Sequence, residues 1–501
     1  MDKTELVAKA AHLFAISGHI VHTSIVINHR EIDIRAEETQ GLTRKVILVE
    51  CADYARPVGV DKLQSDLNKL RAAQESLKDR AIIMHLSKNG YSSQASGYAM
   101  DQGIFICTLD SLTHRLINFD AYVEAIKNDK LRPIILREYQ PSKLRFDRSP
   151  KALAQGGLSF IKEWIKSDKT WLTLLGDYGV GKSWLLKRLL YDLTDDYEKD
   201  PTHTPLAFFI PLQKFPKSFD SKTLILKMFD TYGLSGIHYE AFQYLSNTGR
   251  IIFLLDSFDE MAQHLNASTI RENLNELLSG LSKNSKAIMT SRPNYFESKA
   301  ERFLIVEQDG ALQWHPLDEK EFLRQNILAR TISSGLESSQ FARLEDLTPQ
   351  QRKKLFKIVL KGKPAAYSKL MDLFTRFQEL DGISHRAVIA RLLTAVAETL
   401  ATEEITETVE GTPLLPSDLE KLNQGRIFSI VITNLLYRDQ AISSVTAMDR
   451  LRFLRSFAVY LQSKRGDVFA APNEIRSLVR ELFSDRADSR RQSGTAIGEL
   501  L

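Results

Sequence analysis

The sequence predicts a multidomain α/β protein in which two sheet-containing domains are followed by a helical region. The chain has 501 residues, enough for about three domains that each bury a core. Strand and helix patterns alternate as far as residue 318, whereas only helical periodicity follows. A glycine-rich turn between a buried strand and a helix, within residues 170–190, is typical of a parallel sheet that binds phosphate.

Residues 1–138 are predicted to form a compact α/β domain. In Thr4–Phe14, residues Leu6, Ala10 and Leu13 share one face, which indicates an amphipathic helix. Runs rich in Val and Ile then indicate strands, and apolar residues three and four apart indicate helices. In chain order the expected elements are the strands Ile20–Asn28, Glu31–Ala36 and Arg44–Cys51, the helix Val58–Ser76, the strand Ala81–Leu86, the helix Ser93–Gln102 and the strand Gly103–Thr108.

Two carboxylates of this domain are candidates for metal-dependent chemistry. Asp33 lies between two isoleucines, so strand alternation points it to the face opposite both of them. In the next strand the same period places Glu50 and Ala52 on a common face. Paired carboxylates on adjacent strands suit Mg²⁺, which activates water and stabilises the leaving oxygen of a phosphodiester. Acidic residues at strand ends are also common solvated surface groups.

The layout IDI…VILVECADYARPVGVDKLQ resembles the PD-(D/E)xK nuclease fold, specifically the Mrr-like type IV restriction endonuclease group, over roughly residues 1–125. The resemblance implies that Asp33 and Glu50 hold the metal and that position 52 carries a catalytic lysine. It also implies that Gln64 and Glu5 line the site. Position 52 is Ala52 here, so we expect the nuclease of this chain to be inactive. Loss at this single position, to alanine, is typical of a deliberate inactivating substitution.

Residues 139–152 are polar, contain prolines and have no period, so we interpret them as a linker. The next domain is predicted over residues 153–318 and opens with TWLTLLGDYGVGKSWLLKRLL. Its turn has the spacing of a P-loop, in which Lys182 reaches the β- and γ-phosphates and Ser183 holds Mg²⁺. Three glycines allow positive φ and bring backbone N–H groups close to a polyphosphate: Gly176, Gly179 and Gly181.

The rest of this domain supplies further candidates at the same edge of the sheet. Asp256 ends a buried strand, where it can bind the Mg²⁺ held by Ser183. Asp259 and Glu260 follow and are candidates to orient water, and Arg292 is a candidate γ-phosphate sensor. The expected strands are Trp171–Leu175, Pro205–Pro211, Arg250–Asp256 and Ala287–Met289, with a helix at Trp184–Leu190 after the first.

GDYGVGKS, LLDSFDE and TSRP, in this order and spacing, resemble the NACHT branch of the STAND NTPases over about residues 168–330. In that family a glycine usually precedes the acidic pair, whereas Ser257 takes that place here. The resemblance implies a P-loop ATPase that binds ATP or ADP with Mg²⁺. A guanine-reading NKxD motif is absent from the sequence, so ATP is expected rather than GTP.

The remaining sequence has helical periodicity over residues 319–412 and 413–501. This run resembles the helical lid and the start of the winged-helix domain that close over nucleotide in STAND proteins. The pattern reaches Leu501 without a capping residue, so we expect the natural chain to continue. The expected helices are Glu319–Ile327, Arg352–Leu360, Tyr367–Gln378, Ser384–Thr399, Arg426–Tyr437, Met448–Gln462 and Pro472–Phe483.

Composition narrows the class of protein. Two cysteines are too few for a disulfide framework, and apolar runs fall short of the roughly 18 residues that cross a bilayer. Asp2 and Glu5 stand where a signal peptide would be basic and then apolar. We therefore expect a cytoplasmic protein without a membrane partner. A net charge of +4 permits DNA as a partner but does not require it.

Together these patterns predict an ATP-regulated, bacterial NLR-like antiphage protein. Nucleotide-driven self-association would activate an N-terminal DNA endonuclease after a phage-derived trigger that the sequence does not identify. The alternative is a non-catalytic DNA-binding or scaffold STAND ATPase with a degenerate nuclease fold. A transcription regulator would need a sequence-reading helix, which the sequence does not indicate.

Overall fold

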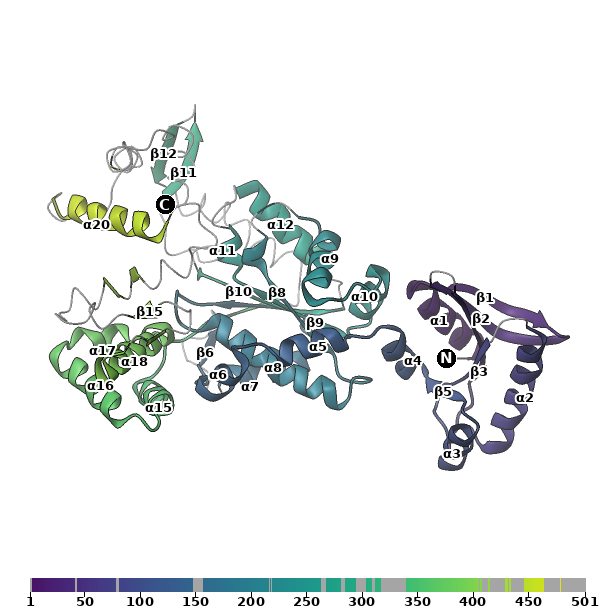
Figure 1. Cartoon of the computed structure of the whole chain (residues 1–501). Helices are drawn as coiled ribbons and strands as arrows, with labels where there is room; N and C mark the ends of the chain where they lie inside the picture. Colours follow the sequence, from purple (N-terminus) through teal and green to yellow (C-terminus); the bar gives the residue numbers. More distant parts are fainter. Residues whose placement is uncertain are drawn as a thin grey trace.

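The computed structural model describes residues 2–40, 43–77, 81–146, 156–215, 217, 219–262, 267–280, 284–293, 303–308, 311–316, 339–404, 406–407, 413–414, 429–430, 432–433, 446–463 and 478. These residues form a five-stranded sheet, a six-stranded sheet, a separate group of helices and two small ribbons. Figure 1 shows the first sheet at one end of the molecule, the second in the middle and the group of helices at the far end.

The first sheet has the strand order β1-β2-β3-β4-β5. Its first three strands form an antiparallel meander, and the last two add in parallel. All five predicted strands are confirmed, and β2 extends to Gln40, beyond its predicted end at Ala36. The strands are β1 (Ile20–Ile27), β2 (Arg30–Gln40), β3 (Thr43–Ala52), β4 (Ala81–Ser87) and β5 (Phe105–Thr108).

Helices cover both faces of this sheet. On one face α2 (Val60–Ser76) buries Leu63, Leu67 and Leu70, whose spacing of three and four places them in one stripe, against the even-numbered residues of β3. On the other face α1 (Lys3–Ile16) packs on the odd-numbered residues of β3. The remaining helices are α3 (Ser93–Asp101), on the α2 face, and α4 (Leu109–Leu116), on the α1 face.

The segment after α4 belongs to the core of the second sheet. Tyr122, on α5 (Asp120–Lys127), is fully buried there, donates its hydroxyl to the carbonyl of Ala207 at 2.8 Å and accepts from the N–H of Phe209 at 2.9 Å. After α6 (Arg132–Glu138) the chain forms β6 (Leu144–Phe146), an edge strand of the same sheet. This packing differs from the predicted domain end at residue 138 and from the predicted linker at 139–152. Both predictions rested on the polarity and prolines of the segment, which do not prevent a short edge strand.

The second sheet has the strand order β6-β13-β7-β10-β9-β8. All its strands run parallel except β6, which is antiparallel to β13. The four predicted strands are confirmed, whereas β13 lies in a region predicted to be helical. The parallel strands are β7 (Trp171–Leu175), β8 (Leu206–Pro211), β9 (Ile251–Asp256), β10 (Lys286–Ser291) and β13 (Ser339–Leu344).

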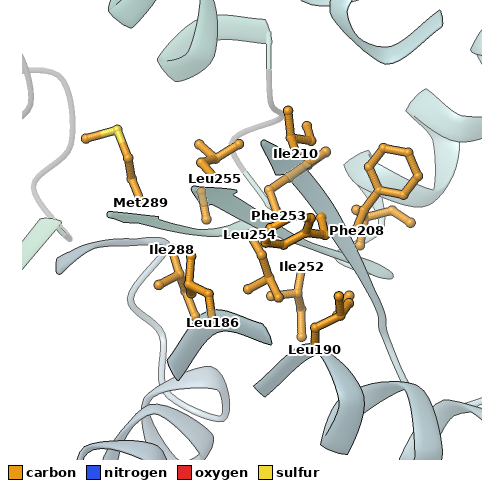
Figure 2. Packing of buried hydrophobic residues seen from close by; sticks show 14 of the residues in the cluster. Leu186, Leu190, Phe208, Ile210, Ile252, Phe253, Leu254, Leu255, Ile288 and Met289 are labelled. Atoms are coloured by element: carbon orange, nitrogen blue, oxygen red, sulfur yellow. The ribbon is translucent and has the colours of Figure 1, made fainter. Parts of the chain in front are cut away.

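These strands are buried on both faces, as expected for a parallel sheet between helix layers. Figure 2 shows Leu186 and Leu190 of α8 (Lys182–Lys199) beneath the sheet, close to Ile252 and Ile288. The helices that complete the layers are α7 (Gly157–Ile165), α9 (Ser221–Tyr232), α10 (Tyr239–Asn247), α11 (Phe258–Ala262) and α12 (Ala267–Gly280).

The helices that follow β13 form their own hydrophobic cluster, here called the lid helices. A capping box between Thr348 and Gln351 starts the first of them. The three helices predicted between residues 352 and 399 are confirmed. The lid helices are α15 (Pro349–Val359), α16 (Pro364–Arg376), α17 (Glu379–Ile383) and α18 (Ala387–Thr402).

The C-terminal region is described only in part. The predicted helix at 448–462 is confirmed as α20 (Ala447–Ser463). The predicted helices at 319–327, 426–437 and 472–483 lie outside the described residues apart from a few positions, as does most of the predicted winged-helix region. No helix in the described ranges combines the length and apolarity needed to cross a bilayer. The small ribbons are β11 (Phe303–Gln308) with β12 (Ala311–Pro316), and β14 (Thr406–Glu407) with β15 (Pro413–Leu414).

Candidate functional site

The glycine-rich loop connects β7 to α8 at the carboxyl edge of the second sheet. The N–H of Gly176 donates to the carbonyl of Ser291 at 3.2 Å, which ties the start of the loop to β10. Gly179 and Gly181 have φ of +77° and +106°, a region that side-chain-bearing residues rarely adopt. Gly181 is the N-cap of α8, so the loop delivers the chain directly to a helix N-terminus, where anions bind favourably.

Lys182 folds back over this loop. Its Nζ donates to the carbonyls of Gly176 at 2.6 Å and Asp177 at 3.2 Å. Burial lowers the pKa of Lys182 from its ordinary value, and the negative charge of Asp259 partly opposes that effect. The ammonium group therefore lies recessed above the loop, within reach of an anion that replaces the two carbonyls.

Asp256 and Ser183 form the second part of the site. Asp256, buried at the end of β9, accepts hydrogen bonds from the hydroxyls of Thr290, at 2.8 Å, and Ser183. Burial raises the pKa of Asp256. A carboxylate beside a serine hydroxyl is a set of hard oxygen donors that fits Mg²⁺. Sequence reasoning missed Thr290, although its position at the end of β10, beside β9, was the available signal.

Arg292 and Asp259 face each other across the same site. Arg292 Nε lies 2.9 Å from Asp259 Oδ2, and its guanidinium lies 5.4 Å from the ring centroid of Tyr178. The predicted sensor is thus held by a buried carboxylate, and a move of Arg292 toward a phosphate would release Asp259. Glu260 is half-buried beside them.

A cavity of about 130 Å³ lies where these residues meet. Two of the segments that line this cavity were not predicted from the sequence. Residues 139–152 were interpreted as a linker, and no site residue was assigned to the helical region 319–412. Its lining includes Lys182, Ser183, Asp259, Glu260 and Arg292 from the segments that follow β7, β9 and β10, Glu138, Tyr139, Gln140 and Ser142 from the segment before β6, and Leu347, Leu355, Ala387, Val388 and Arg391 from the lid region.

The lid helices contact the glycine-rich loop directly. The N–H of Val388 donates to the carbonyl of Gly179 at 3.1 Å, and Arg386 donates to the carbonyl of Tyr178 at 2.9 Å. A Cβ placed on Gly179 would lie 2.3 Å from Cγ1 of Val388, a separation that real atoms do not tolerate. The start of α18 therefore closes on the loop only because residue 179 is glycine.

An ion pair joins the same helix to α6. Arg391 Nε lies 2.8 Å from Oε2 of Glu138, whose other oxygen is 2.6 Å from Arg137. The Glu138 side chain is fully buried, so its charge depends on these partners. The position of α18 is in this way linked to the helix that leads out of the first domain.

The predicted carboxylate pair of the first domain comes together on β2 and β3. Asp33 accepts a hydrogen bond from the N–H of Cys51 at 2.7 Å. The predicted alternation fails here, since Ile32 packs on the α2 face and Ile34 on the α1 face. Ser24, opposite Asp33 on the neighbouring strand, has a positive φ, and the pairing of β1 with β2 is interrupted at these two residues without a change of register.

Two lysines that sequence reasoning missed contact these carboxylates. Lys3 Nζ lies 3.0 Å from Asp33 Oδ2 and 3.2 Å from Glu50 Oε1. Lys69 Nζ, from α2, lies 2.8 Å from both oxygens of Glu50. Burial raises the pKa of Glu50, an effect that Lys69 partly offsets. The carboxylates are recessed, with 10% and 4% of their side chains exposed, whereas the lysines reach solvent.

The other predicted residues of this site are arranged differently. Ala52 is buried on the α2 face, the face that Glu50 also occupies, as predicted. Gln64 is half-buried on α2, but the α2 residue that contacts Glu50 is Lys69. Glu5 is exposed and pairs with Lys9 at 2.8 Å, and the α1 residue at the carboxylates is Lys3 instead.

The carboxylate pair offers hard oxygen donors that fit Mg²⁺. Binding of the ion requires that Lys3 and Lys69 give up their ion pairs with these carboxylates. Within the described ranges, His, Cys, Asp and Glu side chains nowhere gather in threes as a metal cage would require. Any ion at this pair would therefore be held by two carboxylates, with ammonium groups as its neighbours.

Comparison with known proteins identifies one part of the chain. Residues 170–321 match the NACHT domain family. An uncharacterized WD repeat-containing protein from Nostoc sp. (strain PCC 7120) is 24% identical over 216 residues, which are 40% of this chain and 14% of that protein. The chain thus matches only a small part of that relative's length.

Two solved structures illustrate the range of similar chains. A mutant of RuvB from Thermotoga maritima is 12% identical, with a TM-score of 0.28, and the match covers 66% of this chain and 80% of that one. A repair endonuclease from Pyrococcus abyssi is 10% identical, with a TM-score of 0.18, covering 22% and 47%.

Proposed function

Starting from the NACHT domain at residues 170–321, we propose that the chain is an ATP-driven switch of the STAND class. The observation that carries this proposal is the cavity lined by Lys182, Ser183 and the lid region, with Asp256 hydrogen-bonded to Ser183 behind it. Such a cavity couples a phosphate-binding loop to an element able to move. Nucleotide binding can then change the position of α18.

The choice of ATP is supported by the wall that precedes β6. Oε1 of Gln140 is buried and has no hydrogen-bond partner among the described residues, while its Nε2 donates to the carbonyl of Glu138 at 3.1 Å. A buried acceptor without a partner favours a ligand that donates a hydrogen bond. The exocyclic amino group of adenine meets that need, whereas guanine presents a carbonyl at the corresponding position.

In the proposed ATPase cycle, Lys182 would exchange its loop carbonyls for the β- and γ-phosphates, and Ser183 and Asp256 would hold Mg²⁺. Bound Mg²⁺ supplies charge neutralisation at the phosphates. Arg292 leaves Asp259 for the γ-phosphate. A water oxygen then bonds to the γ-phosphorus, the bond from that phosphorus to the bridging oxygen breaks, and Glu260 accepts the water proton.

The first domain is proposed as a DNA endonuclease effector that opening of the lid and self-association bring together in pairs. Its support is the recessed Asp33–Glu50 pair, which fits Mg²⁺, and the ammonium groups beside it, which suit a phosphate backbone. By its resemblance to bacterial defence proteins, we place this activity in the cytoplasm, against phage DNA, under a phage-derived trigger.

The buried Ala52 favours a second candidate, in which the first domain binds DNA or partners without cutting. Two measurements on the full chain separate the candidates: size-exclusion chromatography with and without ATP, and nicking of supercoiled plasmid with Mg²⁺. We expect ATP to produce a larger species and Ala52→Lys to nick DNA in that species. Asp33→Asn, added to Ala52→Lys, should abolish nicking and leave assembly unchanged. Assembly without nicking, in both the parent and Ala52→Lys, would favour the second candidate.

A further inference from the structure

Lys69 places its ammonium group beside the carboxylate pair, on the side of the sheet from which a lysine at position 52 would approach that pair. The even-numbered residues of β3 face α2, so Glu50 and Ala52 look toward the same helix. Lys69 extends from that helix toward Glu50. Its Nζ lies 2.8 Å from each of the two carboxylate oxygens of Glu50. Lys3 differs, because it comes from α1 on the opposite face, is more exposed and divides its contacts between Asp33 and Glu50.

Neighbouring contacts fix the register of α2 and hence the place of Lys69. His85 pairs with Glu50 across the sheet and is fully buried. Its Nε2 lies 3.1 Å from Oδ2 of Asp66, one turn before Lys69, and its Nδ1 lies 2.9 Å from the hydroxyl of Tyr91. A buried polar network of this kind holds the helix at one rotation against the strands, so Lys69 is positioned rather than loosely tethered.

We propose that Lys69 supplies, from α2, the ammonium group that Ala52 lacks, so that this chain is an active DNA endonuclease with alanine at position 52. The inference rests on the proposed nuclease function and replaces the expectation that Ala52 inactivates it. It makes Lys69 a catalytic residue that touches the scissile phosphate.

The proposed reaction is hydrolysis of a phosphodiester. A water oxygen bonds to phosphorus, the bond from phosphorus to the 3′ oxygen breaks, the water proton passes to solvent, and the leaving oxygen takes a proton from a second water. Mg²⁺ at Asp33 and Glu50 would supply Lewis-acid polarisation of the phosphate. Lys69, released from Glu50 by that ion, places its positive charge on the nonbridging oxygen where negative charge develops.

The test compares five forms of the full chain for nicking of supercoiled plasmid with ATP and Mg²⁺: the parent, Ala52→Lys, Lys69→Met, Lys9→Met and the double variant Ala52→Lys with Lys69→Met. Lys9→Met is the matched control, because Lys9 also pairs with a glutamate of the first domain but lies on the exposed face of α1. We expect Lys69→Met to lose about 100-fold in nicking rate, the usual cost of one donor to a transition-state oxyanion. Lys9→Met should match the parent, and the double variant should recover.

A second readout does not depend on cleavage. In nucleotide-free chains, Mn²⁺ titration by calorimetry should give Lys69→Met roughly 5-fold tighter binding than the parent, because an ammonium no longer competes for Glu50. The gain should vanish when Glu50→Gln is added.

Each outcome has one reading. Equal nicking by parent and Lys69→Met, or nicking by Ala52→Lys alone while the parent stays inactive, overturns the role of Lys69 and leaves the nuclease function standing. Unchanged Mn²⁺ affinity in Lys69→Met also overturns it. Nicking by neither the parent nor Ala52→Lys, in chains that assemble with ATP, overturns the nuclease function itself.

Discussion

Gly179 is the residue at which the glycine-rich loop and α18 come closest. Substitution by alanine costs about 1–2 kcal/mol for the positive φ alone and also forces Val388 aside. We expect Gly179→Ala to open the lid and speed release of a fluorescent ADP analogue about tenfold, which corresponds to 1.4 kcal/mol.

Gly362 provides the matched control for this substitution. Its φ of +78° is nearly the same, and a Cβ there would meet nothing within 4 Å. Gly362→Ala should lower the melting temperature without changing ADP release. Equal release rates in the two variants would show that the contact with Val388 does not hold the lid.

Lys182 is the second residue whose role is testable alone. Lys182→Ala removes the ammonium group that the loop presents at the helix N-terminus, so we expect ATP binding to be lost in a fluorescent-nucleotide titration. Lys187→Ala is a useful control, since Lys187 lies on the same helix but pairs with Asp129, away from the cavity. Unchanged affinity in Lys182→Ala would remove the basis for the P-loop assignment.

For individual residues, the sequence predicted those site residues that belong to a local motif. The spacing of Gly176, Lys182 and Ser183 predicted the loop, and the structure brings it together with Asp256 and Arg292. Glu138 and Lys69 could not be predicted in the same way, because Arg391 and Glu50, the partners that give them a role, lie on other elements. An isolated charge in a sequence has no visible partner.

Among the elements, α6 and α18 are coupled by the Glu138–Arg391 pair. Arg391→Ala leaves a fully buried carboxylate with Arg137 as its remaining arginine partner in the structure, at a cost toward the low end of roughly 3–5 kcal/mol. We expect a lower melting temperature and self-association that no longer requires ATP. Light scattering after gel filtration would measure the second effect.

The control for this pair is Arg376→Ala on α16. Arg376 pairs with Asp372 at the surface, where an i,i+4 ion pair contributes about 0.3–0.5 kcal/mol. It should change neither the melting temperature nor the assembly. An Arg391→Ala chain that stays monomeric without ATP would argue against a latch between α6 and α18.

The strands β6 and β13, which sequence reasoning missed, are made by long-range pairing. The segment SQFARL of β13 is short and only half apolar, and it becomes a strand because β7 and β6 pair with it on either side. The parallel strands β7, β8, β9 and β10 carry their apolar run within the sequence and were predicted, whereas the helices α9 and α12 were not. Tertiary context decides the short edges of a sheet.

For the whole molecule, Glu260 and Asp256 should separate turnover from binding. Glu260→Gln retains the metal-binding pair but loses the proton acceptor, so we expect it to trap ATP and accumulate the larger species on size-exclusion chromatography. Asp256→Asn should bind ATP weakly in Mg²⁺ and remain small. A Glu260→Gln chain no larger than the parent in ATP would contradict assembly as the mode of activation.

The pairing of β6 with β13 determines where modules can be exchanged during evolution or by design. Arg145 on β6 and Glu345, directly after β13, are 200 residues apart in sequence and lie 2.6 Å from each other. The chain therefore enters and leaves the domain of the second sheet at the same edge. A foreign N-terminal domain fused ahead of Ile117 keeps the pairing of β6 with β13 and the hydrogen bonds of Tyr122 to β8. A splice at residue 153 deletes a strand and leaves β13 as an open edge, which invites aggregation. Fusions made ahead of Ile117 should therefore be more soluble than fusions made at residue 153, whatever the function of the foreign domain.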